Sequence, residues 1–144
     1  MSIIADIADA VLAALNGHSF SQSFTAVRAY RAEYDLRDMG ALRVTVVPKA
    51  VEMTTAGRGL AQSDIQLDLA VQKKLSANIS GDNAEIDALM GIVQEIAEFI
   101  RSTGRFGGAV WVKTENSPIY APEHLGEMRL FTSVLTLTLR VMTA

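Results

Sequence analysis

Two stretches of the chain repeat apolar residues at the three- and four-residue spacing of an amphipathic helix. The first covers residues 2–16 and is followed by Gly17, and the second covers residues 83–102 and is followed closely by Gly104. Glycine just beyond the last periodic residue is a common helix end. Both stretches are therefore predicted as helices that bury one face.

The other regular stretches have the period of β-strands. Between Asp64 and Lys73 every second residue is apolar, and the same alternation continues for longer near the C-terminus. That pattern is typical of a strand with one buried face. Three shorter stretches rich in β-branched and aromatic residues complete the set. The predicted strands cover residues 24–30, 42–48, 64–73, 109–114 and 128–142.

Prolines and glycines indicate where these strands stop. Pro48 is expected to end the strand at 42–48, because proline has no N–H for a β-ladder. Residues 49–62 contain two glycines and are predicted as a hairpin connection or a mobile loop of unusual length. An irregular connection is expected at 35–38, and a second loop, broken by Pro118 and Pro122, is expected after residue 114.

The predicted order is α-β-β-β-α-β-β. Strands joined by loops favour antiparallel pairing, and two amphipathic helices can cover one sheet face. The expected fold class is α+β: an antiparallel or mixed sheet of about five strands packed against two helices. No repeat, low-complexity tract or linker divides the sequence, so residues 1–144 are predicted to form a single domain.

Composition narrows the functional classes. The 144 residues are 49% hydrophobic and 20% charged, which is sufficient for a core and does not match a disordered chain. Thirteen basic against 16 acidic residues give a net charge of −3, which argues against a general grip on nucleic acid. The N-terminal stretch has no basic region of an export signal, and no stretch is long and apolar enough to predict a membrane span.

Candidate chemistry is sparse. The chain has no cysteine, and its two histidines, His18 and His124, have no partner at ligand spacing, so no metal is expected. No G-x-S-x-G elbow is present, and the Gly57-Arg58-Gly59 stretch lacks the Lys-Ser/Thr of a phosphate loop. We therefore predict no enzyme, no catalytic residues and no cofactor.

Two features remain to be explained. Trp111 is expected to close the core against the second helix, although with Phe106 and Tyr120 it could instead form an aromatic patch for a partner. The strands at 64–73 and 128–142 are long for so small a chain, and long exposed edges invite pairing with another chain. The combination indicates an assembly component.

The chain resembles the tail-terminator (tail-completion) proteins of long-tailed bacteriophages. The resemblance rests on the initial helix and on the segment from Tyr30 to Leu75, in which an Asp35-Leu36 pair precedes a strand that ends in Val47-Pro48. A Thr/Gly/Arg loop and a strictly alternating strand follow. The later order of long helix, short strand and long terminal strand is similar too.

The resemblance implies a structural virion protein. About six copies would form a ring that caps the tail tube, stops its polymerisation and joins it to the head connector or stopper protein. Such a protein is made in the host bacterial cytoplasm and ends at the tail–head junction of the virion. It binds no membrane and makes no sequence-specific contact with nucleic acid. The expected assembly-interface residues are Thr55, Gly57, Arg58, Glu115, Asn116 and Tyr120.

Other assignments stay open at this point. A head-completion protein or a tail-tube subunit belongs to the same assembly and can share these patterns. A small ligand-binding or catalytic α+β domain would instead require an apolar cavity with convergent polar groups. An adaptor that binds a partner by strand addition would use an exposed sheet edge.

Overall fold

A computed structural model describes residues 2–30, 40–76, 82–117 and 119–143. Within them the chain is α+β, with three helices and one six-stranded sheet. The elements are, in order, α1 (Ile3–Asn16), β1 (Thr25–Arg28), β2 (Arg43–Gly57), β3 (Leu60–Lys74), α2 (Asp82–Thr103), β4 (Arg105–Phe106), β5 (Ala109–Glu115), α3 (Pro122–Met128) and β6 (Leu130–Thr143).

The sheet is mixed, and its strand order is β1-β2-β3-β6-β5-β4. β1 runs parallel to β2, while every other neighbouring pair is antiparallel. Three neighbouring strands are long: β2 and β3 have 15 residues each and β6 has 14. The C-terminal strand β6 lies between β3 and β5, so the last segment of the chain forms part of the centre of the sheet.

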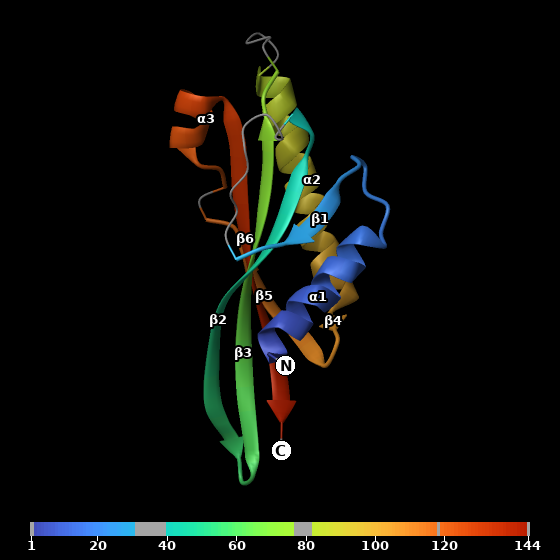
Figure 1. Ribbon diagram of the computed structural model, residues 1–144, viewed down its shortest axis with the longest axis vertical. Helices are drawn as coiled ribbons and strands as arrows, with labels where there is room; N and C mark the ends of the chain where they lie inside the picture. Colours follow the sequence, from blue (N-terminus) through green and yellow to red (C-terminus); the bar gives the residue numbers. More distant parts are fainter. Residues whose placement is uncertain (1, 31–39, 77–81, 118, 144) are drawn as a thin grey trace.

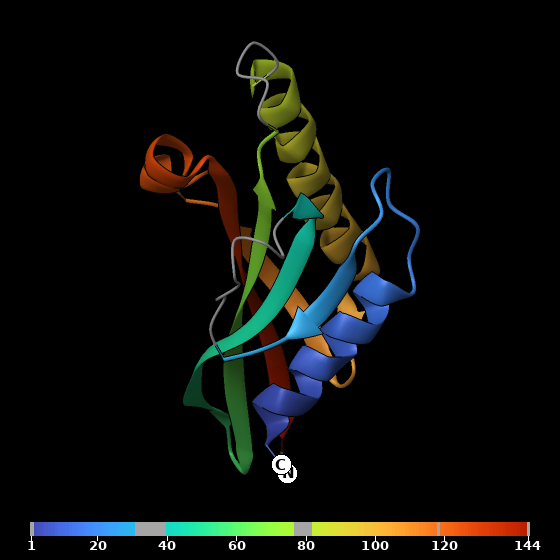
Figure 2. The same ribbon diagram turned by 45° about the horizontal axis from the view of Figure 1, so that its top comes forward.

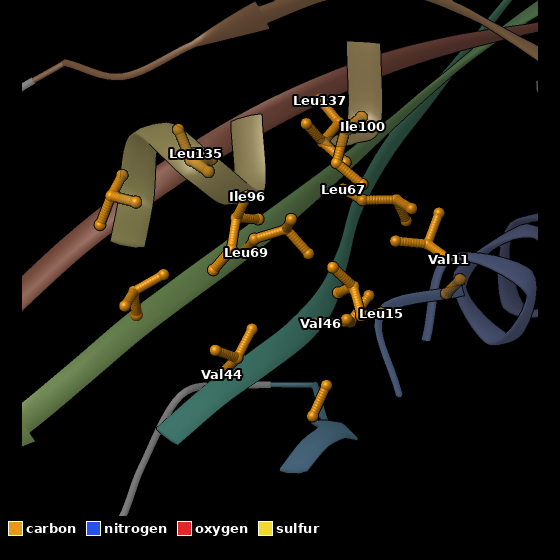
Figure 3. Packing of buried hydrophobic residues seen from close by; sticks show 14 of the residues in the cluster. Val11, Leu15, Val44, Val46, Leu67, Leu69, Ile96, Ile100, Leu135 and Leu137 are labelled. Atoms are coloured by element: carbon orange, nitrogen blue, oxygen red, sulfur yellow. The ribbon is translucent and has the colours of Figure 1, made fainter. Parts of the chain in front are cut away.

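α1 and α2 lie on one face of the sheet, as Figures 1 and 2 show. The alternation in β3 is confirmed: Ile65, Leu67 and Leu69 are completely buried on this face. Figure 3 shows how residues of α1, α2, β2, β3 and β6 meet there. The labelled members of this core are Val11, Leu15, Val44, Val46, Leu67, Leu69, Ile96, Ile100, Leu135 and Leu137.

One arginine joins two distant parts of the chain. Arg129 follows α3 in the left-handed conformation (φ 48°), and its guanidinium donates to both carboxylate oxygens of Asp82, at 2.9 and 3.0 Å. It also donates to the Ser76 carbonyl. These bonds connect the start of β6 with the first turn of α2, and they lower the pKa of Asp82.

A strand is confirmed at 43–48, but the predictions that Pro48 ends it and that residues 49–62 form a loop are wrong. β2 continues through Pro48 to Gly57, and residues 49–62 form the outer part of a long hairpin with β3. Among the described residues, β1 covers the far edge of β2 only up to Val46. An edge strand tolerates proline, and the register shifts directly after Pro48, which together explain why the strand survives it.

The predicted strand and helix counts are also too low. The loop expected after residue 114 contains α3, which begins at Pro122, where a missing N–H costs nothing. β4 was not predicted, because two residues are too few for a period. Gly104 ends α2 as expected, with φ 71°. The expected connection at 35–38 and Pro118 lie outside the described residues.

α3 lies beside the start of β6, away from α2 (Figures 1 and 2). None of the helices in the described part of the chain combines the length and apolar character that crossing a membrane requires.

Candidate assembly surface

The β2–β3 hairpin extends beyond the part of the sheet that the two helices cover (Figure 1). Its strands stay paired up to Gly57 and Leu60, so the extension is regular structure. Its side chains nevertheless lose their cover: Val51 is 40% exposed and Met53 is 70% exposed. Apolar side chains on a projecting, uncovered strand are typical of a surface that meets another molecule.

Three of the expected interface residues lie at the end of this hairpin. Thr55 is exposed in the last paired stretch of β2, Gly57 is the last residue of that strand, and Arg58 forms the two-residue turn with Gly59. Gly57 and Gly59 both have positive φ, 140° and 74°, which explains the two glycines of the turn. Arg58 is exposed there, as a cation at the far end of the molecule.

The other three expected residues do not form one surface loop. Glu115 is the last residue of β5 and pairs with Lys113 at 3.0 Å. Asn116 is half-buried, and its side-chain amide donates to the Val134 carbonyl at 2.8 Å and to Ser133 Oγ at 3.0 Å. Asn116 therefore fastens the chain to β6 and is not free for a partner. Tyr120, 39% exposed, stays accessible.

The face of the sheet opposite α1 and α2 is polar and hollowed. Ion pairs cross it: Arg140 donates to Asp64 at 2.8 Å, and Lys49 lies 3.7 Å from Asp68. The hydrogen bonds from Arg140 lower the pKa of Asp64. A hollow of about 450 Å³ lies on this face, and its lining includes Ala50, Glu52, Asp64, Gln66, Lys113 and Thr138.

A second hollow, an apolar groove of about 540 Å³, lies between α2 and β5 on the helix-covered side. We call it the α2–β5 groove. Its apolar lining consists of Met90, Val93, Ala97, Trp111, Ile119 and Leu135. Trp111 packs against the core, as expected, but it also forms one wall of the groove. Phe106 is buried, so the alternative aromatic patch with Phe106 and Tyr120 is not formed.

Most polar groups that line the α2–β5 groove already have hydrogen-bond partners within the chain. Trp111 Nε1 donates to Thr114 Oγ1 at 2.8 Å, and Arg101 donates to Glu98 at 2.6 Å. Asn116 is held by β6, as described above. The groove therefore offers mainly apolar surface, which fits hydrophobic side chains of another chain better than it fits a polar metabolite.

Each histidine contacts a side chain of the same chain. His18 stacks on Phe99, with ring centroids 4.4 Å apart, and His124 Nδ1 lies 2.7 Å from Thr132 Oγ1. Within the described residues, no three His, Asp or Glu side chains gather as metal ligands.

Sequence reasoning missed the α2–β5 groove and the polar hollow. The groove joins Met90 and Trp111, which belong to different elements, and no local period reports that contact. The one available signal was the alternation of Val51 and Met53 with Glu52 and Thr54, a pattern typical of a strand. Pro48 and the two glycines, which are typical loop residues, mask this signal.

No protein-family model matches the chain, and no curated protein sequence is significantly similar to it.

Proposed function

We propose that the chain is a structural component of a long-tailed bacteriophage, a tail terminator whose copies form a ring on the end of the tail tube. The ring stops tube polymerisation and gives the head connector a surface to bind. The carrying observation is the projecting hairpin, with Met53 70% exposed and Arg58 at its turn. Such an arm is suited to reaching a neighbouring copy or the tube.

The polar sheet face supports the same proposal. A ring with its helices outside turns this face toward a central passage. Lys49, Lys113 and Arg140 are each paired with a carboxylate there. Paired cations offer little free positive charge to phosphates, so DNA can pass without being held.

The test is electron microscopy of tails assembled with the chain, without it, and with a variant that lacks the hairpin end. We expect uncontrolled tail length without the chain and with the variant. A matched variant that only replaces Glu123, exposed on α3, should restore normal length. Normal length in the absence of the chain would refute the proposal.

A tail-tube subunit is the second candidate from the same assembly, because the same hairpin could connect successive rings. The two differ in whether growth stops: purified tube subunits polymerise without limit, while a terminator stops at one ring. The length distribution of the assembled particles therefore separates them.

The α2–β5 groove favours one candidate from another class, a small ligand-binding protein. Its volume of about 540 Å³ falls within the range of ligand pockets. A metabolite that raises the melting temperature, and loses this effect when Met90 is replaced by a larger side chain, would support that function instead.

A further inference from the structure

Two stretches of strand edge have no neighbouring strand in the described part of the chain. β1 covers β2 up to Val46, whose carbonyl accepts a hydrogen bond from the Ala29 N–H at 3.0 Å. Beyond it, residues 47–57 are uncovered. At the opposite edge of the sheet, β4 pairs with the start of β5, and the Trp111 N–H donates to the Gly104 carbonyl at 2.8 Å. Residues 112–115 are uncovered.

These two edges lie at the same level of the sheet. Ala50 stands opposite Gln66, Gln66 opposite Thr138, and Thr138 opposite Lys113. One level further along, Val51 is connected in the same way with Trp111, through Ile65 and Leu139. A second copy at the same height therefore brings its residues 112–115 beside residues 47–50 of the first.

The strand directions also match. Three antiparallel steps, β2–β3, β3–β6 and β6–β5, separate the two edges, so β5 runs opposite to β2. A copy rotated about an axis parallel to the strands keeps its helices on the same side. Its β5 then lies antiparallel to β2 of the first copy, as in an ordinary antiparallel ladder.

The side chains at the two edges are complementary. Val51 shares the helix-covered face with Ile65, so in a continuous sheet it points into the α2–β5 groove of the neighbouring copy. Val47 comes to the level of Glu115, and Glu52 comes diagonally to Lys113, which places one pair of opposite charges across the contact.

We propose that successive copies join edge to edge, β2 residues 47–50 of one copy pairing antiparallel with β5 residues 112–115 of the next. Val51 fills the α2–β5 groove, and the sheet continues from copy to copy. This inference deepens the proposed ring and rests on it. It also divides the hairpin: its first half binds a neighbouring copy, and its end, with Met53 and Arg58, stays free for the tube.

The absence of cysteine in the sequence allows a direct test. Chains carrying only Ala50→Cys are mixed with chains carrying only Lys113→Cys and oxidised mildly over a range of concentrations up to about millimolar. Both positions are exposed, and paired antiparallel residues lie about 4.5–5.5 Å apart, within reach of a disulfide. We expect disulfide-linked pairs at least tenfold more abundant than in a mixture of Ala50→Cys with Glu123→Cys.

Two results would overturn the inference. One is a yield no higher than that of the Glu123→Cys control. The other is preferential linkage of Ala50→Cys to itself, which indicates a two-fold dimer through β2 alone. A small molecule that abolishes the disulfide linkage at the concentration at which it fills the α2–β5 groove would support the edge contact. The molecule and the neighbouring copy would then compete for the same surface.

A chain that carries both Ala50→Cys and Lys113→Cys separates this inference from the proposed function. Within one chain the two cysteines lie three strand spacings apart, about 14 Å along the sheet, so they cannot close on each other. A linked series that stops at one ring supports both proposals. An open-ended series supports edge pairing and refutes the terminator. Rings without linkage leave the terminator standing and refute the edge pairing.

Discussion

Both halves of β2 pair antiparallel with β3, but they have opposite surroundings. In the first half, Val44 and Val46 are completely buried beneath the helices. In the second half, Val51 and Met53 are 40% and 70% exposed although their partners on β3 continue without interruption. Burial therefore stops where the helices stop, while the strand does not.

The difference shows that strand length here exceeds what the core requires. Regular pairing beyond the core leaves apolar side chains and an open backbone edge in water, which proteins usually avoid by shortening or covering an edge. The uncovered edge, Val51 and the α2–β5 groove are the features on which the proposed contact between copies rests.

The largest effect is expected for Leu67→Ala, in the covered half of β3. Leu67 is completely buried, so the variant should lose about 2–5 kcal/mol of unfolding free energy. Leu60→Ala is the matched control on the same strand, since Leu60 is 44% exposed, and it should change stability by less than about 0.5 kcal/mol. Urea unfolding measures both. Equal losses would contradict the contrast between the two halves.

A smaller effect is expected from replacing a glycine by alanine, once at the hairpin turn and once in α2. Gly59, at the hairpin turn, has φ 74°, so Gly59→Ala should destabilise the turn by about 1–2 kcal/mol. The loss should appear as faster amide hydrogen exchange at 53–62, with little change in global unfolding. Gly91→Ala in α2, where an added Cβ meets open space, should instead stabilise by about 1 kcal/mol. A global loss for Gly59→Ala would show that the hairpin end is part of the core's cooperative unit.

A pH-dependent effect is expected where Asp64 bonds Arg140, between β3 and β6. The pKa of Asp64 is lowered in the folded chain, chiefly by these hydrogen bonds. A carboxyl group whose pKa is lower in the folded chain stabilises the fold fully at pH values above its unfolded pKa of about 3.9. This stabilisation is lost as the pH falls through the folded pKa.

Arg140→Gln should therefore destabilise the chain at neutral pH, and its difference from the unmodified chain should shrink as the pH falls below about 4. Urea titrations at several pH values provide the measurement. A difference that grows on acidification would have the wrong sign and would exclude this ion pair as its cause.

The smallest effect on the free chain, but a large one on assembly, is expected for Val51→Asp. Because Val51 is 40% exposed, the variant should keep its unfolding free energy within about 0.5 kcal/mol. Copy-to-copy association should weaken at least tenfold, since a carboxylate would enter an apolar groove. Val110→Asp is the matched control: Val110 is 43% exposed, but β4 covers its edge. Sedimentation at several concentrations compares them, and equal association of the two variants would refute the edge contact.

Periodicity predicted the α+β class, both long helices and the two strands that form the centre of the sheet. Ile65 and Leu139 sit on the buried face because their neighbours alternate, and that information is local. The outer half of β2 could not be predicted with the same rule. Pro48 and the glycines of the turn are typical loop residues, and only the edge position of β2 explains why Pro48 is tolerated.

The sequence by itself determined which residues form the helices and the inner strands, because each of those elements buries one face and its period records that burial. Among the expected interface residues, Arg58 lies in a turn, but this turn has two residues and is not the loop of 49–62 that the sequence predicted. Only the tertiary structure decided that Asn116 is held by β6, that Trp111 lines a groove beneath α2, and that residues 47–50 and 112–115 stand level on two open edges. These relations depend on which strands become neighbours, and β6 enters the centre of the sheet from the far end of the chain. A local pattern records whether a side chain is buried, but it does not record which element buries it.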